Sequence, residues 1–173
     1  MRKVLFFIVF FISSLQGFSQ NDVYNVARSG TVDELKALMK SDPDIINKIN
    51  SDGYSPLILA CYKGNVDVAK YLIDHVKDIN YTSVMGTALM SATVKKNTEL
   101  VKLLLEKNAN PNIADNNGST ALIYASIFKQ YDIASLLIKY KSDDTHKDNR
   151  GNSAIDYAIL ADDDKLIQIL KTK

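Results

Sequence analysis

The stretch Asn50-Ser51-Asp52-Gly53-Tyr54-Ser55-Pro56-Leu57-Ile58-Leu59-Ala60 decides the fold, because a looser form of it recurs along the chain. Gly53, Gly86, Gly118 and Gly151 stand 33, 32 and 33 residues apart, and a matching string follows each one. The later strings are Thr87-Ala88-Leu89-Met90-Ser91-Ala92, Thr120-Ala121-Leu122-Ile123-Tyr124-Ala125 and Ser153-Ala154-Ile155-Asp156-Tyr157-Ala158. A fixed period of this length indicates a stacked array of short units that share one continuous core.

The unit that begins at Asn50 shows how each repeat is expected to fold. Gly53 can adopt the positive φ that a tight turn needs. Ser55 suits the N-cap of a helix and Pro56 suits its first position, where a backbone donor is not required. Gly64 then suits the end of that short helix. A second helix is predicted by the apolar stripe Val66, Ala69, Leu72 and Ile73.

These strings resemble those of the ankyrin repeat family, whose 33-residue unit carries a Thr-Pro-Leu-His-x-Ala signature. The signature is kept as Ser55–Ala60, while its histidine is absent from every string. The family's Gly-His after the first helix is present only as Gly64-Asn65. The resemblance implies an all-α solenoid of stacked helix-turn-helix units with short β-turn or hairpin tips. About five repeats including caps are expected in a domain spanning 20–173: a capping repeat at about 21–49, repeats at about 50–80, 81–113 and 114–147, and a C-terminal repeat at 148–173.

The first 19 residues have the pattern of a secretory signal peptide. Arg2 and Lys3 precede an almost wholly apolar run from Val4 to Leu15, and Gly17 and Ser19 stand where a signal peptidase prefers small residues. An uncleaved membrane anchor is the alternative, although the apolar run is shorter than the roughly 20 residues of a spanning helix. We therefore expect export to the periplasm or the outside of the cell, with no membrane attachment after cleavage.

The formal net charge is +1, and loss of Arg2 and Lys3 with the signal would change it to −1. A nearly neutral chain has no electrostatic feature that favours nucleic acid or an anionic membrane as a partner. The chain contains one cysteine, so it cannot form an intramolecular disulfide. The apolar core alone is expected to hold the fold together.

Few residues are candidates for chemistry. Cys61 falls at a small position of its first helix, where we expect burial and no reactivity. His75 and His146 have no cysteine or carboxylate at metal-ligand spacing. The run Asp162-Asp163-Asp164 opens a second helix, where carboxylates are stabilised by the helix dipole. No phosphate loop, nucleophile elbow or zinc spacing is present. We predict no catalytic residue, cofactor or metal, and no enzyme activity.

In ankyrin proteins the turn tips and the inner face of the first helices line a concave groove that contacts the partner. Carried over by position, the tips are Ser51, Asp52 and Tyr54; Val84 and Met85; Asn116, Asn117 and Ser119; and Asn149, Arg150 and Asn152. Thr87 follows Gly86 directly, whereas one residue separates each of the other turn glycines from its cap, so the third repeat is one residue shorter at this point.

The inner helix face is the more informative part. The seventh residues after the caps are apolar: Tyr62, Val94, Ile127 and Leu160. An exposed apolar line flanked by charge is typical of a protein interface, the alternative being that neighbouring repeats half-cover it. The predicted partner-binding residues are Tyr54, Tyr62, Lys63, Val94, Lys95, Ile127, Phe128, Leu160, Asn117 and Arg150.

The resulting functional expectation is a non-catalytic protein–protein interaction module, monomeric, that acts as an adaptor, inhibitor or protective partner of another exported protein. Two alternatives stay open at this point. One is a structural or self-assembling unit in which the apolar line packs against another copy. The other is an enzyme with a site in the groove, which two or more titratable groups clustered on the concave surface would favour.

Overall fold

The computed structural model describes residues 22–172, and the expected signal peptide at 1–19 lies outside them. Within 22–172 the secondary structure is helical, apart from an isolated β-bridge between Ser83 and Gly86. The all-α prediction is therefore confirmed. The helices are α1 (Val23–Ser29), α2 (Val32–Ser41), the short 3₁₀ helix η1 (Ile45–Asn47), α3 (Pro56–Lys63), α4 (Val66–His75), α5 (Ala88–Val94), α6 (Thr98–Glu106), α7 (Ala121–Ile127), α8 (Tyr131–Lys139), α9 (Ala154–Leu160) and α10 (Asp164–Lys171).

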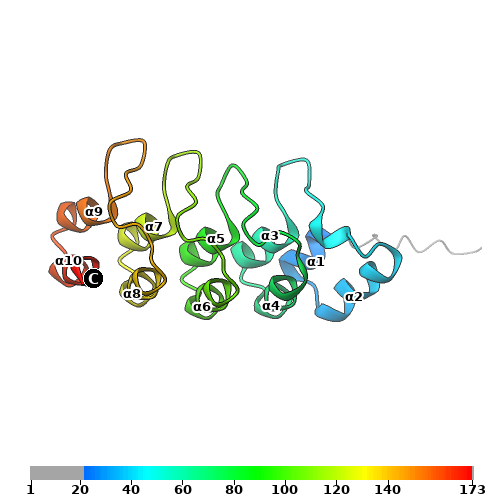
Figure 1. Ribbon diagram of the computed structural model, residues 1–173. Helices are drawn as coiled ribbons and strands as arrows, with labels where there is room; N and C mark the ends of the chain where they lie inside the picture. The colour runs from blue at the N-terminus through cyan, green and yellow to red at the C-terminus, as the bar shows by residue number, and fades with distance from the viewer. Residues whose placement is uncertain (1–21, 173) are drawn as a thin grey trace, which may run out of the picture.

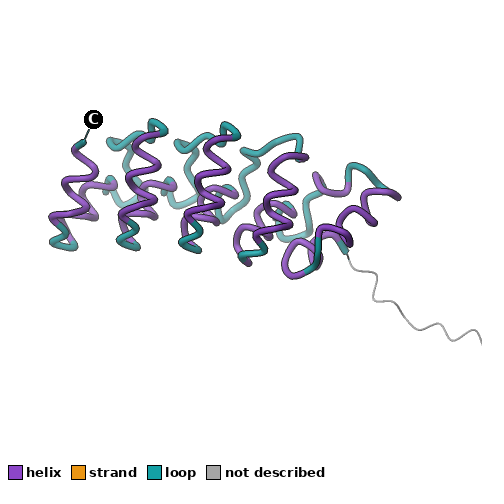
Figure 2. Tube along the Cα trace, turned by 90° about the horizontal axis from the view of Figure 1, so that it is seen from below, coloured by secondary structure: helices purple, strands orange, loops and turns teal. Residues whose placement is uncertain are grey.

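The helices stack in pairs, and the pairs follow one another in a row (Figure 1). Each first helix contacts the first helix of the next pair, and each second helix contacts the next second helix. The view from below shows the same row of antiparallel pairs (Figure 2). Long loops project from the row on one side, above α3, α5, α7 and α9 in Figure 1. This arrangement is a two-layer helical solenoid with hairpin tips, as the period of the sequence predicts.

Side-chain caps set the start of each first helix. Ser55, Thr87, Thr120 and Ser153 each accept a hydrogen bond from the backbone amide three residues later. Pro56 occupies the first turn of α3, where no backbone donor is missed. The recurrent strings of the sequence are thus helix starts, and they fix the same entry angle in each repeat.

The ends of the first helices differ between repeats. Gly64 ends α3 in the left-handed conformation, with φ of 74°. Lys96, Lys129 and Asp162 hold the equivalent places after α5, α7 and α9, with φ of 56°, 51° and 50°. A side chain in this conformation is strained by its Cβ, which glycine lacks. The last three repeats therefore keep the left-handed backbone conformation that the family places on glycine, although the residue there is not glycine.

A single apolar core runs through the stack. Small residues lie where neighbouring first helices meet, and Ala60, Ala92, Ala125 and Ala158 have no exposed surface. Larger side chains fill the space between the two helical layers. Those that are fully buried include Leu72, Leu89, Leu100, Leu104, Leu122, Ile133, Leu137 and Leu166.

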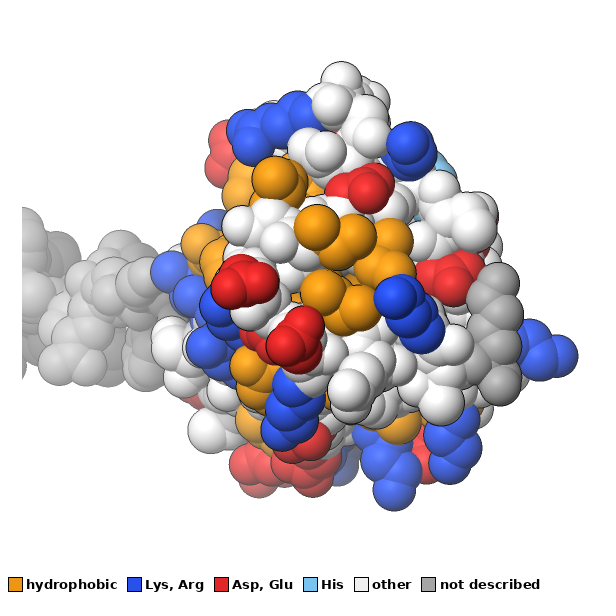
Figure 3. All heavy atoms as spheres, turned by 90° about the vertical axis from the view of Figure 1, so that its left-hand side faces the viewer, with side chains coloured by type: hydrophobic (Ala, Val, Ile, Leu, Met, Phe, Trp, Pro, Cys, Tyr) orange, Lys and Arg blue, Asp and Glu red, His pale blue; other side chains and the backbone are white. Residues whose placement is uncertain are grey.

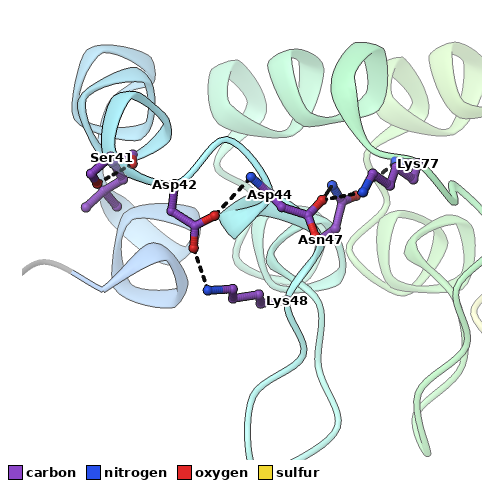
Figure 4. Close-up of polar contacts among 7 residues, drawn as sticks. Ser41, Asp42, Asp44, Asn47, Lys48 and Lys77 are labelled. Carbon is purple, nitrogen blue, oxygen red and sulfur yellow. Dashed lines mark hydrogen bonds and ion pairs between the residues drawn. The ribbon is translucent and has the colours of Figure 1, made fainter.

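Asparagine side chains link successive loops after the second helices. The Asn47 side chain accepts a hydrogen bond from the amide of Lys77 at 2.9 Å. Asn80 does the same for the amide of Asn110 at 2.7 Å, and Asn112 for the amide of Asp143 at 2.7 Å. Figure 4 shows the first of these links. There the Asp44 carboxylate also accepts a hydrogen bond from the Asn47 side-chain amide and forms an ion pair with the Lys77 ammonium at 2.7 Å. These links tie each repeat to the next through the loops that lead into the hairpins.

An acidic or amide side chain organises three of the hairpins from within. One oxygen of Asp148 accepts hydrogen bonds from the amides of Arg150 and Asn152, and the other accepts one from the Tyr157 hydroxyl at 2.5 Å. Asp115 repeats this arrangement with Tyr124, and Asn50 repeats the amide contacts. The third repeat has a tighter turn in which Ser83 and Gly86 exchange both backbone hydrogen bonds.

The N-cap residue of α8 makes no side-chain capping hydrogen bond, which gives a first testable prediction. Gln130 is buried, and its side-chain amide has no hydrogen-bond partner within the described chain. The matching Asn97 and Asp163 cap their helices at 3.0 and 3.1 Å. Gln130→Asn should raise the free energy of unfolding by about 1 kcal/mol, because the shorter side chain reaches the cap position.

Urea denaturation followed by circular dichroism measures this change. Gln130→Ala is the matched control, since it removes the unpaired amide without supplying a cap. An asparagine variant no more stable than the alanine variant would contradict the prediction.

A second prediction concerns acid stability. Burial raises the pKa of Asp148, but the hydrogen bonds from Tyr157, Asn152 and Arg150 outweigh it and leave the pKa below its usual value. The folded state therefore binds this proton less readily than the unfolded state. Its stabilising contribution is present above the ordinary aspartate pKa, near 4, and is lost as the pH falls through the lower folded value.

Asp148→Asn should therefore flatten the acid side of the stability curve, while Asn50 shows that an amide can still organise the turn. Chemical denaturation at a series of pH values between neutrality and strong acid checks this. An unchanged loss of stability on acidification would show that Asp148 contributes nothing to it.

Candidate protein-binding groove

The hairpin tips and the C-terminal ends of the first helices form a surface that we call the groove. Its most apolar hollow lies between the second and third repeats and has a volume of about 180 Å³. The lining residues are Tyr54, Ile58, Leu59, Tyr62, Lys63, Met85 and Ser91. We call it the Tyr54–Met85 pocket. It brings together three of the predicted partner-binding residues, Tyr54, Tyr62 and Lys63.

The pocket has a buried floor and exposed walls. Ile58 and Leu59 belong to the core and are almost wholly covered. Tyr62 is 38% exposed and Met85, at the tip of the next hairpin, is 57% exposed. The short turn that holds Met85 depends on Gly86, because its φ is +89° and an added Cβ would lie 2.1 Å from the Met90 sulfur. The shortened hairpin thus supplies one wall of the pocket.

Two lysines flank the exposed tyrosine. The Lys95 ammonium lies 4.3 Å from the centre of the Tyr62 ring, and the Lys63 ammonium lies 5.8 Å from it. At such distances the electrons of the ring face attract a positively charged group. Lys63 ends α3 and Lys95 follows α5, so the cluster spans two repeats.

A second hollow of the groove, of about 220 Å³, lies between the fourth and fifth repeats and is more polar. It contains the predicted residues Asn117, Ile127 and Arg150. Ser119, Tyr124, Asp148, Asn149 and Tyr157 complete its lining. The Asn149 side chain donates a hydrogen bond to the carbonyl of Asn116, 3.0 Å away, so neighbouring tips are held together.

The remaining predicted residues are spread along the groove. Ile127 and Phe128 are each 40% exposed, and the Phe128 ring is nearly parallel to that of Tyr124 at 6.3 Å. Leu160 is 74% exposed at the end of α9. Val94 is half-buried and lines neither hollow. The line of side chains is therefore accessible at Tyr62, Ile127 and Leu160 and partly covered at Val94.

The polar hollow contains several titratable groups, which is the feature that would favour an enzyme. Both oxygens of Asp148 accept hydrogen bonds, and its lowered pKa makes it a weak base. Burial, and then the hydrogen bond to Asp115, raise the pKa of Tyr124 to about 12, so its proton is firmly held. These Asp–Tyr pairs brace the hairpins, and their geometry gives no support to proton transfer at neutral pH. Sequence reasoning missed them, although an aspartate nine residues before a tyrosine recurs in the last two repeats.

The other residues considered for chemistry contribute to packing, hydrogen bonding or helix capping. Cys61 is fully buried, and burial raises its pKa to about 12. His75 stacks on Tyr71 with 4.0 Å between ring centres, and His146 makes a hydrogen bond to the Gly118 carbonyl at 2.8 Å. Asp163 caps α10. Between residues 22 and 172 no group of three or more His, Cys, Asp or Glu side chains is placed to hold a metal ion. No helix in the same range has the length and apolar character needed to cross a membrane.

Comparison with known proteins agrees with this architecture. The family model for ankyrin repeats (3 copies) matches residues 23–115 and 93–173. The rat ankyrin repeat and SAM domain-containing protein 6 is 36% identical over 101 residues, which are 57% of this chain and 11% of that protein. The 26S proteasome non-ATPase regulatory subunit 10 of Dictyostelium discoideum is 35% identical over 92 residues, 52% of this chain and 40% of the relative.

A bacterial relative is also similar. The putative ankyrin repeat protein YahD of Escherichia coli is 34% identical over 93 residues, 50% of this chain and 46% of its own length. The chain thus spans less than half the length of each of these relatives. Since the two matches of the family model together cover residues 23–173 and the helices stack as the repeats require, the chain belongs to the ankyrin repeat family.

Proposed function

We propose that this chain is a non-catalytic binding module whose groove holds another protein, acting as an adaptor, inhibitor or protective partner. Ankyrin repeats are in general protein–protein interaction modules, and that general role belongs to the family. The specific role, and the use of the groove residues for it, are our proposal.

The observation that carries the proposal is the exposure of large apolar side chains that the frame does not need. Tyr62, Met85 and Ile127 each leave more than a third of their surface open to solvent. They lie around two hollows on the same face, between hairpins that the core holds in place. Apolar surface flanked by lysines and amides is typical of a site that a partner covers.

The names of similar proteins support the same class of function. The Dictyostelium relative is by name a regulatory subunit of the 26S proteasome, and a human relative, 33% identical over 95 residues, is by name a BCL-6 corepressor-like protein. Those names describe the relatives, and we take from them only that ankyrin arrays of this kind occur in proteins that act with others.

The compartment of the partner is a further part of the proposal. Arg2, Lys3 and the apolar run that follows them favour an exported protein, so the partner would be a periplasmic or secreted protein. A matched pair of expression experiments, with and without residues 1–19, would show whether this segment directs export.

Self-association is a second candidate function, favoured by one surface. Figure 3 looks onto the C-terminal end of the described array, where apolar side chains gather among acidic and basic ones. Ile159 and Leu160 of α9 are 57% and 74% exposed. We expect a monomer in solution. A molar mass of two chains by light scattering, reverting to one in Leu160→Asp, would favour self-association instead.

The binding role is tested by charge placed on the groove. Tyr62→Asp and Ile127→Asp should each weaken capture of the partner by roughly 30-fold or more, because central anchors of an interface contribute about 2 kcal/mol or more. Affinity capture from an extract of the exported compartment, quantified by mass spectrometry, measures the loss.

The control is Ser135→Asp, which adds the same charge at an exposed position on the second helix α8. Circular dichroism should show that all variants remain helical. Partners retained equally by the groove variants and the control would end the proposal.

A further inference from the structure

The charges around the Tyr54–Met85 pocket narrow the kind of partner that fits it. Resting on the binding role proposed above, we propose that the groove holds an extended acidic segment of a polypeptide. This segment places one large apolar side chain in the Tyr54–Met85 pocket and its carboxylates against Lys63 and Lys95.

The pocket matches a single large side chain. A cavity of roughly 150 Å³ in another protein accepts a benzene molecule, so about 180 Å³ has room for one phenyl ring or a leucine side chain. Its floor is formed by buried residues of α3 and is already in place. The flexible Met85 side chain at the rim can adapt to the shape of what enters.

The two lysines at the pocket are unlike those on the other side of the array. Lys70 pairs with Glu99 at 2.5 Å, Lys107 with Asp74 at 2.6 Å, and Lys77 with Asp44 at 2.7 Å. Among the described residues, neither Lys63 nor Lys95 forms an ion pair with a carboxylate. Both ammonium groups instead lie beside one aromatic ring, so their mutual repulsion is not offset by an anion.

The acidic side chains of the groove are not placed to satisfy these lysines. Asp52, at the tip of the hairpin before Tyr54, does not line the pocket. Asp115 and Asp148 are buried and accept hydrogen bonds from tyrosines on the first helices that follow their hairpins. A carboxylate brought by a partner would therefore meet two cations without a competing acid at the pocket.

The rest of the groove suits the continuation of the same segment. Ile127 and Phe128 offer apolar surface on the fourth repeat, and Arg150 adds a third cation at the polar hollow. An extended acidic chain with an apolar residue at the pocket thus meets apolar and cationic groups along one face. A basic segment would meet repulsion at both ends, which also provides specificity.

Synthetic peptides test this with the purified protein. The probe is a fluorescein-labelled peptide of twelve residues with one central phenylalanine among glutamate, aspartate and serine. The comparison peptides replace either the phenylalanine with alanine or the acids with lysine. Fluorescence anisotropy should show binding of the first peptide, at least roughly tenfold weaker binding of the other two, and weakening with added salt.

The charge-reversed double variant Lys63→Glu/Lys95→Glu should invert the preference, so that the basic peptide binds more tightly than the acidic one. Lys139→Glu/Lys171→Glu, at exposed positions on α8 and α10, is the charge-matched control and should bind like the parent. Equal binding of the acidic and basic peptides, no binding of the acidic peptide at millimolar concentration, or an unaltered preference in Lys63→Glu/Lys95→Glu would each overturn the proposal.

The outcome separates this proposal from the broader one. If Tyr62→Asp abolishes capture of natural partners while Lys63→Glu/Lys95→Glu leaves it intact, the groove binds protein but not through acidic segments. If neither set of variants changes capture, the proposed function of the groove fails as well.

Discussion

The close contact between successive first helices is the constraint on which the rest of the molecule depends. It is possible because Ala60, Ala92, Ala125 and Ala158 lie at the contact and have no exposed surface. Interiors are packed densely enough that even one extra methylene at such a place forces neighbours apart. Since successive helix pairs pack against one another along the row, these contacts set the spacing of the hairpins and hence the form of the groove.

Much of this frame could be predicted from the sequence because it depends on residues close together in the chain, in a pattern that each repeat contains. The caps at Ser55, Thr87, Thr120 and Ser153, and the left-handed residue Gly64, involve residues within a few positions of each other. The burial of Cys61 followed from its place in the repeat. Repetition makes such signals reliable, because each one recurs in the same register.

The groove was less predictable because its features join residues about 30 positions apart. The Lys95 contact with Tyr62 depends on how two neighbouring helices end, and the shortened hairpin carries Met85 to the pocket. Val94 belongs to the apolar line in sequence, yet its surroundings cover part of it. The spacing of apolar residues along the chain does not predict side-chain contacts between neighbouring repeats. The partner-binding role of the ten predicted residues stays a prediction.

The left-handed residues at the helix ends have a consequence for how the array comes apart. A side chain in that conformation costs roughly 1–2 kcal/mol, and Lys96, Lys129 and Asp162 each bear this strain after a first helix, whereas Gly64 does not. Local opening therefore requires less free energy toward the C-terminal repeats, so hydrogen exchange there should be faster than in α3 and α4. The Tyr54–Met85 pocket lies between this unstrained second repeat and the third, so only one of its two sides belongs to a repeat that bears the strain.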